Sequence, residues 1–287
     1  AQANPNTTYR YSTVSLKDDS GLVAQSILFA QKASGYKTVH VETAGTLENY
    51  ISADEKEKLI GLKLTGKLNT FDYDFMRTMP ALESVDLAQI DNTTIPASCF
   101  KESTVKTVIL PLNLEAIPDN AFSNSNITSI DIPSSVVSIG VGAFADCSDL
   151  TGILTLPNNL RIIGAAAFTY CKQLTGNLII PNSVVSIGQR AFAACNGFNG
   201  FLSLGSGLTT VPLMCFERCS GFTGNLIIPD QITTIEKFAF LDCTGFSGNL
   251  VLGAELQSIG DNSLTQKGSM SGNYYPLNFS KVYCKNS

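Results

Sequence analysis

Apolar residues recur along most of this 287-residue chain at a fixed interval of 22 to 24 positions. One column of the pattern is phenylalanine: Phe100, Phe122, Phe144, Phe168, Phe192, Phe216 and Phe240. A second column is isoleucine or valine: Ile95, Ile117, Ile139, Ile163, Ile187, Val211, Ile235 and Ile259. Five cysteines keep an interval of 24: Cys147, Cys171, Cys195, Cys219 and Cys243. A fixed interval in this range is typical of a repeat protein, in which each unit packs against its neighbours.

Each unit has the same internal order. A short alternating run ends in proline or glycine, as in Leu178-Ile179-Ile180-Pro181, and a second apolar stretch ending in Ile-Gly leads to Ala-Phe. This order predicts a short strand, a turn, a second extended stretch and a short helical or 3₁₀ turn. One unit cannot bury its apolar columns, whereas stacked units can, because their strands pair in parallel at roughly 4.8 Å. The pattern therefore predicts a stacked α/β repeat with a parallel β-sheet on one face and short turns on the other.

The extent of the pattern divides the chain into three regions. We expect a solenoid of 22- to 24-residue units over residues 59–265, a small α+β N-terminal capping region over residues 1–58, and a C-terminal cap over residues 266–287. The caps are expected because the first and last units of a solenoid each lack one neighbour.

Local patterns predict the elements of the two end regions. Asp18, Asp19 and Ser20 precede an apolar pattern from Leu22 to Ala30, which predicts a capped helix. The alternation over residues 38–42 predicts a strand, and residues 47–58 predict one or two short helices. A second alternating run over residues 278–284 predicts a strand that closes the last unit.

Composition excludes several classes of protein. Charged residues make up 15% of the chain and apolar residues 44%, which argues against intrinsic disorder. The net charge is −5 and no cluster of Lys and Arg stands out, so we expect no nucleic-acid partner. The most apolar window, residues 22–30, is too short to span a membrane. Because no signal peptide is visible, the chain is either cytosolic or a mature form whose targeting segment has been removed.

The eight cysteines are interpreted through the repeat. Ser103 and Ser125 occupy the cysteine position in earlier units, which indicates a buried packing position for free thiols. Disulfides between neighbouring units are the alternative. A metal site is not expected, because thiolates in one column cannot close a tetrahedron without further ligands. Cys284 lies outside the column and stays unexplained.

Two segments carry a family resemblance. Ile-Pro-Ser-Ser-Val-Val-Ser-Ile-Gly-Val-Gly-Ala-Phe-Ala-Asp-Cys at 132–147 and Ile-Pro-Asn-Ser-Val-Val-Ser-Ile-Gly-Gln-Arg-Ala-Phe-Ala-Ala-Cys at 180–195 resemble the BspA-type leucine-rich repeat. The resemblance covers about residues 80–265, with departures at Gly205, Gly253 and Val211-Pro212. Residues 39–66 resemble the segment that precedes such repeats in surface proteins of anaerobic Gram-negative bacteria of gut and mouth.

The resemblance implies a right-handed leucine-rich-repeat solenoid and a secreted or outer-surface location. It also implies that a signal sequence was removed, either an ordinary one or a lipoprotein one that would provide a lipid anchor. Members of the family are associated with adhesion to host matrix proteins and with contacts between bacteria, so the implied partner is a protein.

Residues suited to catalysis are few, and no cofactor or metal site is expected. The single histidine, His40, lies in a predicted strand and is expected to have a structural or surface role. Asp72 and Asp74 could serve acid and base catalysis or bind Ca²⁺, but they lack the loop and oxygen ligands of a calcium site, so solvated helix residues are expected. The Thr-Gly pairs at 151, 175 and 223 recur once per unit and fit the geometry of the repeat. We therefore expect no enzyme.

A binding surface is better supported. The middle residue of each strand lies between two buried ones and should face outward. The outward residues predicted to contact a partner are Asp131, Thr155, Ile179, Phe201, Ser203, Ile227 and Val251, with Asp86 and Ile109 earlier and Ile153, Asn177, Asn225 and Asn249 beside them. Ordinary β-propensity could explain the apolar members, as could a ligand-binding or self-association surface. The sequence thus predicts a non-catalytic surface recognition or adhesion module for protein partners; a glycan-binding accessory and a structural spacer are the alternatives.

Overall fold

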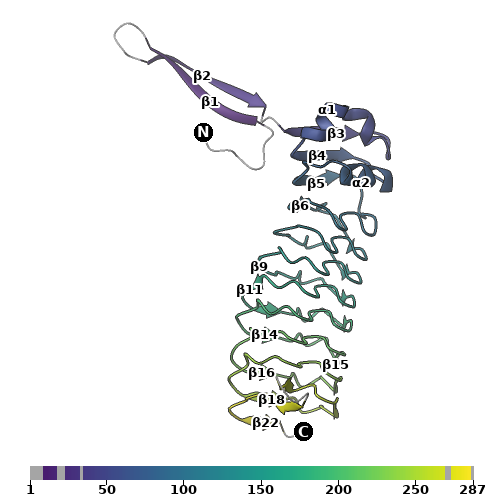
Figure 1. Ribbon diagram of the computed structural model, residues 1–287, viewed down its shortest axis with the longest axis vertical. Coiled ribbons are helices and arrows are strands. Elements are labelled where there is room, and N and C mark those ends of the chain that lie inside the picture. The colour runs from purple at the N-terminus through teal and green to yellow at the C-terminus, as the bar shows by residue number, and fades with distance from the viewer. Residues whose placement is uncertain (1–8, 18–22, 33–34, 269–272, 286–287) are drawn as a thin grey trace.

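Layers joined by short parallel strands and stacked along one axis form most of the molecule, as the computed structural model shows (Figure 1). The structure describes residues 9–17, 23–32, 35–268 and 273–285, and for the first two of these ranges only the backbone. The repeating columns of the sequence become continuous rows that run through the stack, which confirms the predicted solenoid.

The N-terminal layers form a four-stranded parallel sheet in the order β3-β4-β5-β6: β3 (Tyr36–Val41), β4 (Gly61–Gly66), β5 (Ser84–Ile90) and β6 (Thr107–Ile109). Between these strands lie the 3₁₀ helix η1 (Leu47–Tyr50) and the helices α1 (Ala53–Lys58) and α2 (Thr70–Arg77). The strand predicted over residues 38–42 and the short helices predicted over residues 47–58 are confirmed.

The helix predicted over residues 22–30 is wrong. The segment forms strand β2 (Val23–Lys32), which pairs antiparallel with β1 (Tyr9–Lys17). Val23, Ile27 and Phe29 favour an extended backbone. The apolar spacing of this segment also fits a strand once residues 9–17 provide a partner. The helix cap predicted at Asp18, Asp19 and Ser20 lies outside the described residues.

Beyond β6 the short strands of the layers fall into two columns. The front column contains β9 (Gly152–Ile153), β11 (Leu174–Thr175), β12 (Leu178–Ile179), β14 (Leu202–Ser203), β16 (Leu226–Ile227), β18 (Leu250–Leu252) and β22 (Val282–Cys284). The second column contains β7 (Ala116–Ile117), β8 (Ser138–Ile139), β10 (Ile162–Ile163), β13 (Ser186–Ile187), β15 (Thr210–Val211), β17 (Thr234–Ile235) and β19 (Ser258–Ile259). Partners lie 22 to 24 residues apart, as the interval predicts, except where β22 closes the stack on β18.

The phenylalanine column forms a stack of rings inside the solenoid. From Phe100 to Phe240, neighbouring ring centroids lie 5.0 to 5.7 Å apart and the ring planes are within 10° of parallel. Tyr73 of α2 closes the N-terminal end of the stack edge-on to Phe100. All seven phenylalanines are essentially fully buried, so this row carries much of the hydrophobic stabilisation of the stack.

The third side of each layer is a turn, whereas the sequence predicted a short helix or 3₁₀ turn. Residues with a left-handed backbone flank each Phe four positions apart, for example Ala166 (φ 52°) and Tyr170 (φ 60°). Left-handed residues interrupt a right-handed helix. Instead, alternate N–H groups donate to the next layer: Ala166 N to Gln189 O and Phe168 N to Ala191 O, at 2.9 and 2.8 Å.

The cysteine column is reduced and buried, as predicted for free thiols. Each Sγ donates a hydrogen bond to the phenylalanine carbonyl of the preceding layer, as from Cys195 to Phe168 O at 2.9 Å. Desolvation raises the pKa of Cys147 to about 11 and that of Cys219 to about 12. The position is therefore more than a packing slot, because it contains a donor in every one of these layers.

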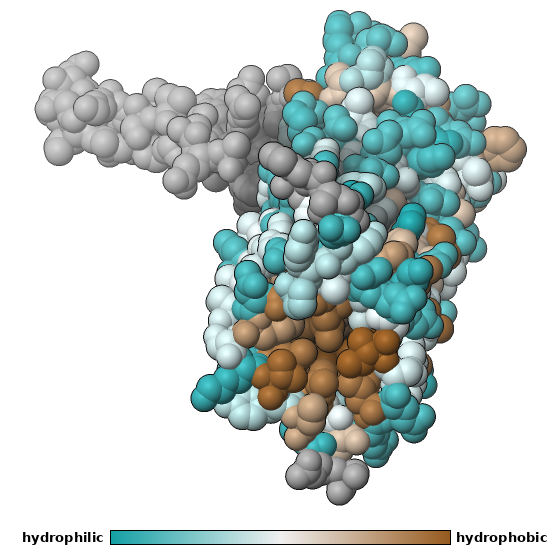
Figure 2. Space-filling model, turned by 60° about the horizontal axis from the view of Figure 1, so that its bottom comes forward, coloured by the Kyte–Doolittle hydropathy of each residue, from teal (hydrophilic) through white to brown (hydrophobic). Residues whose placement is uncertain are grey.

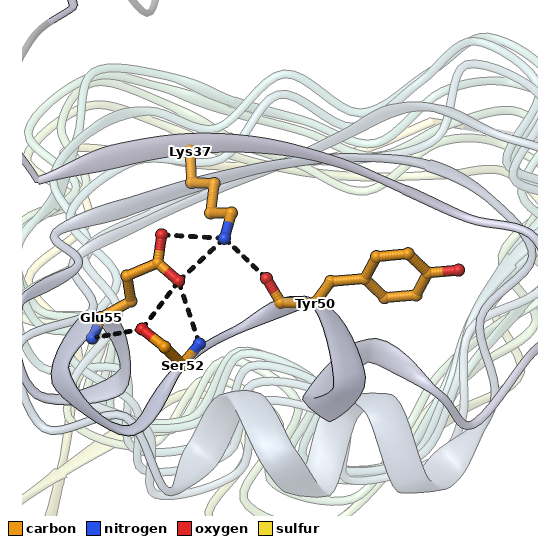
Figure 3. A network of polar contacts seen from close by, with 4 residues as sticks. All are labelled: Lys37, Tyr50, Ser52 and Glu55. Carbon is orange, nitrogen blue, oxygen red and sulfur yellow. Dashed lines mark hydrogen bonds and ion pairs between the residues drawn. The ribbon is translucent and has the colours of Figure 1, made fainter.

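Helix α1 is fixed to the first strand by a polar network (Figure 3). Lys37 Nζ of β3 lies 2.8 Å from both carboxylate oxygens of Glu55 and donates to Tyr50 O at 2.6 Å. Ser52 caps the helix, since its Oγ accepts from Glu55 N at 3.3 Å while its own N–H donates to Glu55 Oε2 at 2.9 Å. The Lys37 hydrogen bond, helped by Ser52, lowers the pKa of Glu55 to about 2.

The C-terminal layer is closed in part. Strand β22 pairs in parallel with β18, which confirms the strand predicted over residues 278–284, and a hairpin of β20 (Thr265–Lys267) and β21 (Tyr274–Pro276) lies before it. Figure 2 shows an apolar patch at this end of the solenoid. In the last layers of the chain, Ile259 and Val282 are exposed, and Leu252, Leu256 and Leu264 are half-buried. Cys284 is exposed, unlike the other seven cysteines.

Candidate functional site

The front face is the outward side of the front column, made by the middle residues of its strands and the residues beside them. The register places them in one row: Lys63, Asp86 and Ile109 are partners, as are Ile179 and Ser203, and Ile227 and Val251. Each of these residues lies between two interior residues, which explains why the alternation of the sequence could locate the face.

The predicted partner-binding residues all lie on this face, with unequal exposure. Asp131, Thr155, Ile179, Phe201 and Ile227 are exposed, whereas Ser203 and Val251 are half-buried. The apolar members are prominent: Ile179, Phe201 and Ile227 expose 52%, 47% and 48% of their surface, and the neighbouring Ile153 exposes 72%. An apolar row of this extent is uncommon on a protein surface that nothing covers.

Charge is confined to the N-terminal half of the front face. Asp86 lies 3.5 Å from Lys63, so these two charges offset each other. Asp131 is exposed and makes no ion pair or hydrogen bond with any described residue. The outward positions from Thr155 to Val251 hold no charged residue. The front face therefore has one uncompensated carboxylate followed by an uncharged apolar half.

Two shallow pockets open on the front face. The first pocket, of about 280 Å³, lies between the layer of β6 and the next layer, where Ile109, Leu112 and Ile130 line it and Asp131 lies at its rim. The second pocket, of about 320 Å³, lies between β14 and β16, with Phe201 and Ile227 as walls. Each has room for one large side chain.

Both pockets coincide with interruptions of the front ladder. The four-stranded sheet ends at β6, whose link to the following layer is a single bridge between Thr107 and Ser129. Strand β14 pairs with β12, and β16 pairs with β18, but β14 and β16 belong to separate sheets. The sequence analysis did not locate the pockets, because every layer has the same alternation whether or not its ladder continues.

Asparagines beside the front face have a role that sequence reasoning missed. Asn177 Oδ1 accepts a hydrogen bond from Phe201 N at 3.0 Å, and Asn225 Oδ1 accepts from Asn249 N at 2.7 Å. Their side chains thus bridge neighbouring layers and hold Phe201 in place. The recurrence of Asn225 and Asn249 at the repeat interval was a signal of such a structural role.

The residues considered for catalysis are not brought together. His40 is exposed on β3, where its Nδ1 lies 2.8 Å from Thr65 Oγ1. Asp74 is half-buried on α2 and forms an ion pair with Arg77. Among the described residues, no group of three or more His, Cys, Asp or Glu side chains has the arrangement of a metal site.

Asp72 differs from the expectation of a solvated residue, because it is buried. Its carboxylate accepts hydrogen bonds from the backbone N–H groups of Gly45, Leu47 and Asn69 at 2.7 to 2.9 Å. These donors replace water around the charge, so Asp72 fixes the loop before η1 to the start of α2.

No helix in the described ranges is long and apolar enough to cross a membrane. No curated protein matches the sequence.

Several solved structures resemble the chain. A leucine rich cell surface protein from Faecalibacterium prausnitzii A2-165 is 16% identical with a TM-score of 0.43, covering 100% of this chain and 96% of its own. The T. pallidum leucine rich repeat protein is 20% identical with a TM-score of 0.48, covering 84% and 89%. The pneumococcal vaccine antigen PcpA is 16% identical with a TM-score of 0.45, covering 95% and 71%.

The family itself is established by the repeat. The BspA type leucine rich repeat region matches in six copies over residues 69–198 and 175–284, well over half of the chain. The matched range contains the stacked phenylalanines, the cysteine column and most of the front face. The protein is a member of the BspA-type leucine-rich-repeat family.

Proposed function

We propose that this protein is a non-catalytic recognition or adhesion module of a cell surface, which binds a protein partner through the front face. The observation that carries the proposal is the exposed apolar row of Ile153, Ile179, Phe201 and Ile227 on a rigid stack. A preformed surface loses little conformational entropy on binding, so a broad apolar contact translates into affinity. Membership of a family of cell-surface leucine-rich-repeat proteins supports the location.

Two other functions are less well supported. A glycan-binding accessory would need aromatic platforms beside acids on the face, but Phe201 is the only aromatic residue among the outward positions from Asp86 to Val251. A structural spacer needs no exposed apolar row at all. A protein partner is therefore the better match to the surface chemistry.

The experiment compares the wild-type protein with the double variant Ile179→Lys/Ile227→Lys. Both are screened by biolayer interferometry against purified extracellular matrix proteins and bacterial cell-wall glycans. We expect at least one matrix protein to bind the wild type, and the double variant to lose at least about tenfold in affinity because two ammonium groups are placed in the apolar contact.

The matched control is Ile162→Lys/Val185→Lys, which places the same charges on exposed positions in β10 and directly before β13 of the second column. Both double variants should melt within a few degrees of the wild type. Equal binding by the two double variants, or selective binding of glycans, would contradict the proposal.

A further inference from the structure

Resting on the proposed function, we infer that the front face takes a segment of a protein that inserts one large apolar side chain into each pocket and places a Lys or Arg beside Asp131. Three observations on the front face carry this inference: the position of the pockets, the distribution of charge and the spacing of the layers.

The pockets provide two anchor points on the front face. The first pocket presents Ile109, Leu112 and Ile130, and the second presents Phe201 and Ile227 beside residues 202–204. Side chains that fill well-packed apolar pockets usually provide most of the affinity of an interface, while the surrounding contacts exclude water. Binding is therefore expected to depend on two side chains of the partner.

The charge of Asp131 favours a cationic residue in the part of the partner that contacts the first pocket. Asp131 lies at the rim of this pocket and has no cation among the described residues, whereas Asp86 on the same row is paired with Lys63. The second pocket lies in the uncharged half, with Ser203 and Asn225 at its edge. A partner with a cation next to its first apolar side chain complements this distribution, and one with a carboxylate there is repelled.

The layers set the distance between the anchors. Four layer spacings separate the pockets, because the first lies between the layers of Ile109 and Asp131 and the second between those of Ser203 and Ile227. At roughly 4.8 Å per layer the distance is about 19 Å. An extended segment spans this distance between the pockets with about six residues, and a helix spans it with about thirteen.

The test uses a phage-displayed library of random 16-residue peptides, long enough for either conformation, selected on the wild-type protein after depletion on Leu112→Lys/Ile227→Lys. We expect enriched peptides to contain two large apolar residues about six or about thirteen positions apart, with Lys or Arg next to one of them. Enrichment of acidic peptides, or no enrichment over the depleted variant, would overturn the inference.

An enriched peptide is then titrated against single variants. Leu112→Lys and Ile227→Lys should each weaken Kd at least tenfold. Asp131→Asn should weaken it about three- to tenfold at low salt, with the difference shrinking at 0.5 M NaCl because the charge pair is exposed. The controls Ile162→Lys and Asp149→Asn, exposed residues outside the front face, should leave Kd unchanged.

The pattern of losses separates the two proposals. If Ile227→Lys weakens binding while Leu112→Lys and Asp131→Asn do not, the front face binds protein but the two-anchor, cationic partner is wrong. If no variant of the front face differs from Ile162→Lys, the proposed function fails together with the inference.

Discussion

The turn side and the front face of this solenoid are built from the same repeating unit, yet their chemistry varies to very different degrees. On the turn side, every layer from Phe100 to Phe240 has a phenylalanine in the same place, and five consecutive layers share the cysteine. On the front face, the equivalent positions hold Asp131, Thr155, Ile179, Ser203 and Ile227 in succession.

The difference follows from what each position contacts. A phenylalanine ring lies between two identical neighbours about 5 Å away, so a change in one layer disturbs three. An outward side chain contacts the adjacent layers only at its edges and is otherwise open to solvent. The turn side thus determines that the layers stack, and the front face is free to specialise without altering the stack.

The largest expected effect comes from opening the ring stack. Phe168→Ala should lower the free energy of unfolding by about 3–5 kcal/mol, because it leaves a cavity between two rings that cannot move together. The measurement is urea denaturation followed by far-UV circular dichroism. Thr155→Ala, on the front face of the same layer, is the matched control and should lower the free energy of unfolding by less than about 0.5 kcal/mol. If the two variants lost similar free energies of unfolding, the turn side would not contribute more to stability than the front face, and the comparison would fail.

A smaller effect is expected in the cysteine column. Cys195→Ala removes the thiol that donates to Phe168 O, although this carbonyl keeps its bond from Cys171 N at 3.1 Å. The free energy of unfolding of this variant should be about 1–2 kcal/mol lower than that of the wild type. Cys195→Ser retains a hydroxyl donor, and its free energy of unfolding should fall less than that of the alanine variant. If serine were the worse substitution, volume rather than hydrogen bonding would control this position.

The smallest effect is expected at the N-terminal cap, and it depends on pH. The pKa of Glu55 is about 2 in the folded protein and near its ordinary value of 4.5 when unfolded, so folding favours the carboxylate. Its stabilising contribution is complete above about pH 4.5 and is lost as the pH falls through 2.

Glu55→Gln should therefore melt below the wild type at pH 7, by no more than a few degrees because the Lys37 pair is partly exposed. The difference in melting temperature between the wild type and this variant should decrease as the pH is lowered from 4.5 to 2, as measured by differential scanning calorimetry. Asp54→Asn, beside it in the exposed i,i+4 pair with Lys58, is the control and should show a weaker pH dependence. A difference in melting temperature that does not change with pH would contradict the lowered pKa of Glu55.

Sequence reasoning worked where a residue is determined by the layer above and below it. Residues of the Phe column, of the cysteine column and of the alternation around Ile179 have the same surroundings in successive layers. Their spacing in the sequence was therefore enough to locate the core and the front face. Sequence reasoning failed at β2, because the apolar spacing of residues 22–30 fits both a helix and a strand. Only the pairing with β1 decides between them.

The features that escaped prediction depend on relations between layers. The end of the ladder at β6 and the gap between β14 and β16 leave no mark on the alternation, although the two pockets lie at these positions. The burial of Asp72 was also hidden, because its three N–H donors come from Asn69 and from a loop more than twenty residues earlier. Non-local hydrogen bonds of this kind have no short sequence signature.

The left-handed residues of the turns determine how the solenoid comes apart. Residues such as Arg190 and Ala194 hold a backbone conformation that costs an L-amino acid roughly 1–2 kcal/mol, and the N–H groups they direct at the next layer offset this cost. A layer separated from its neighbours keeps the cost and loses the hydrogen bonds. Unravelling therefore begins at the terminal layers and proceeds inward, and a central layer exchanges its amide protons only after one of the ends has opened up to it.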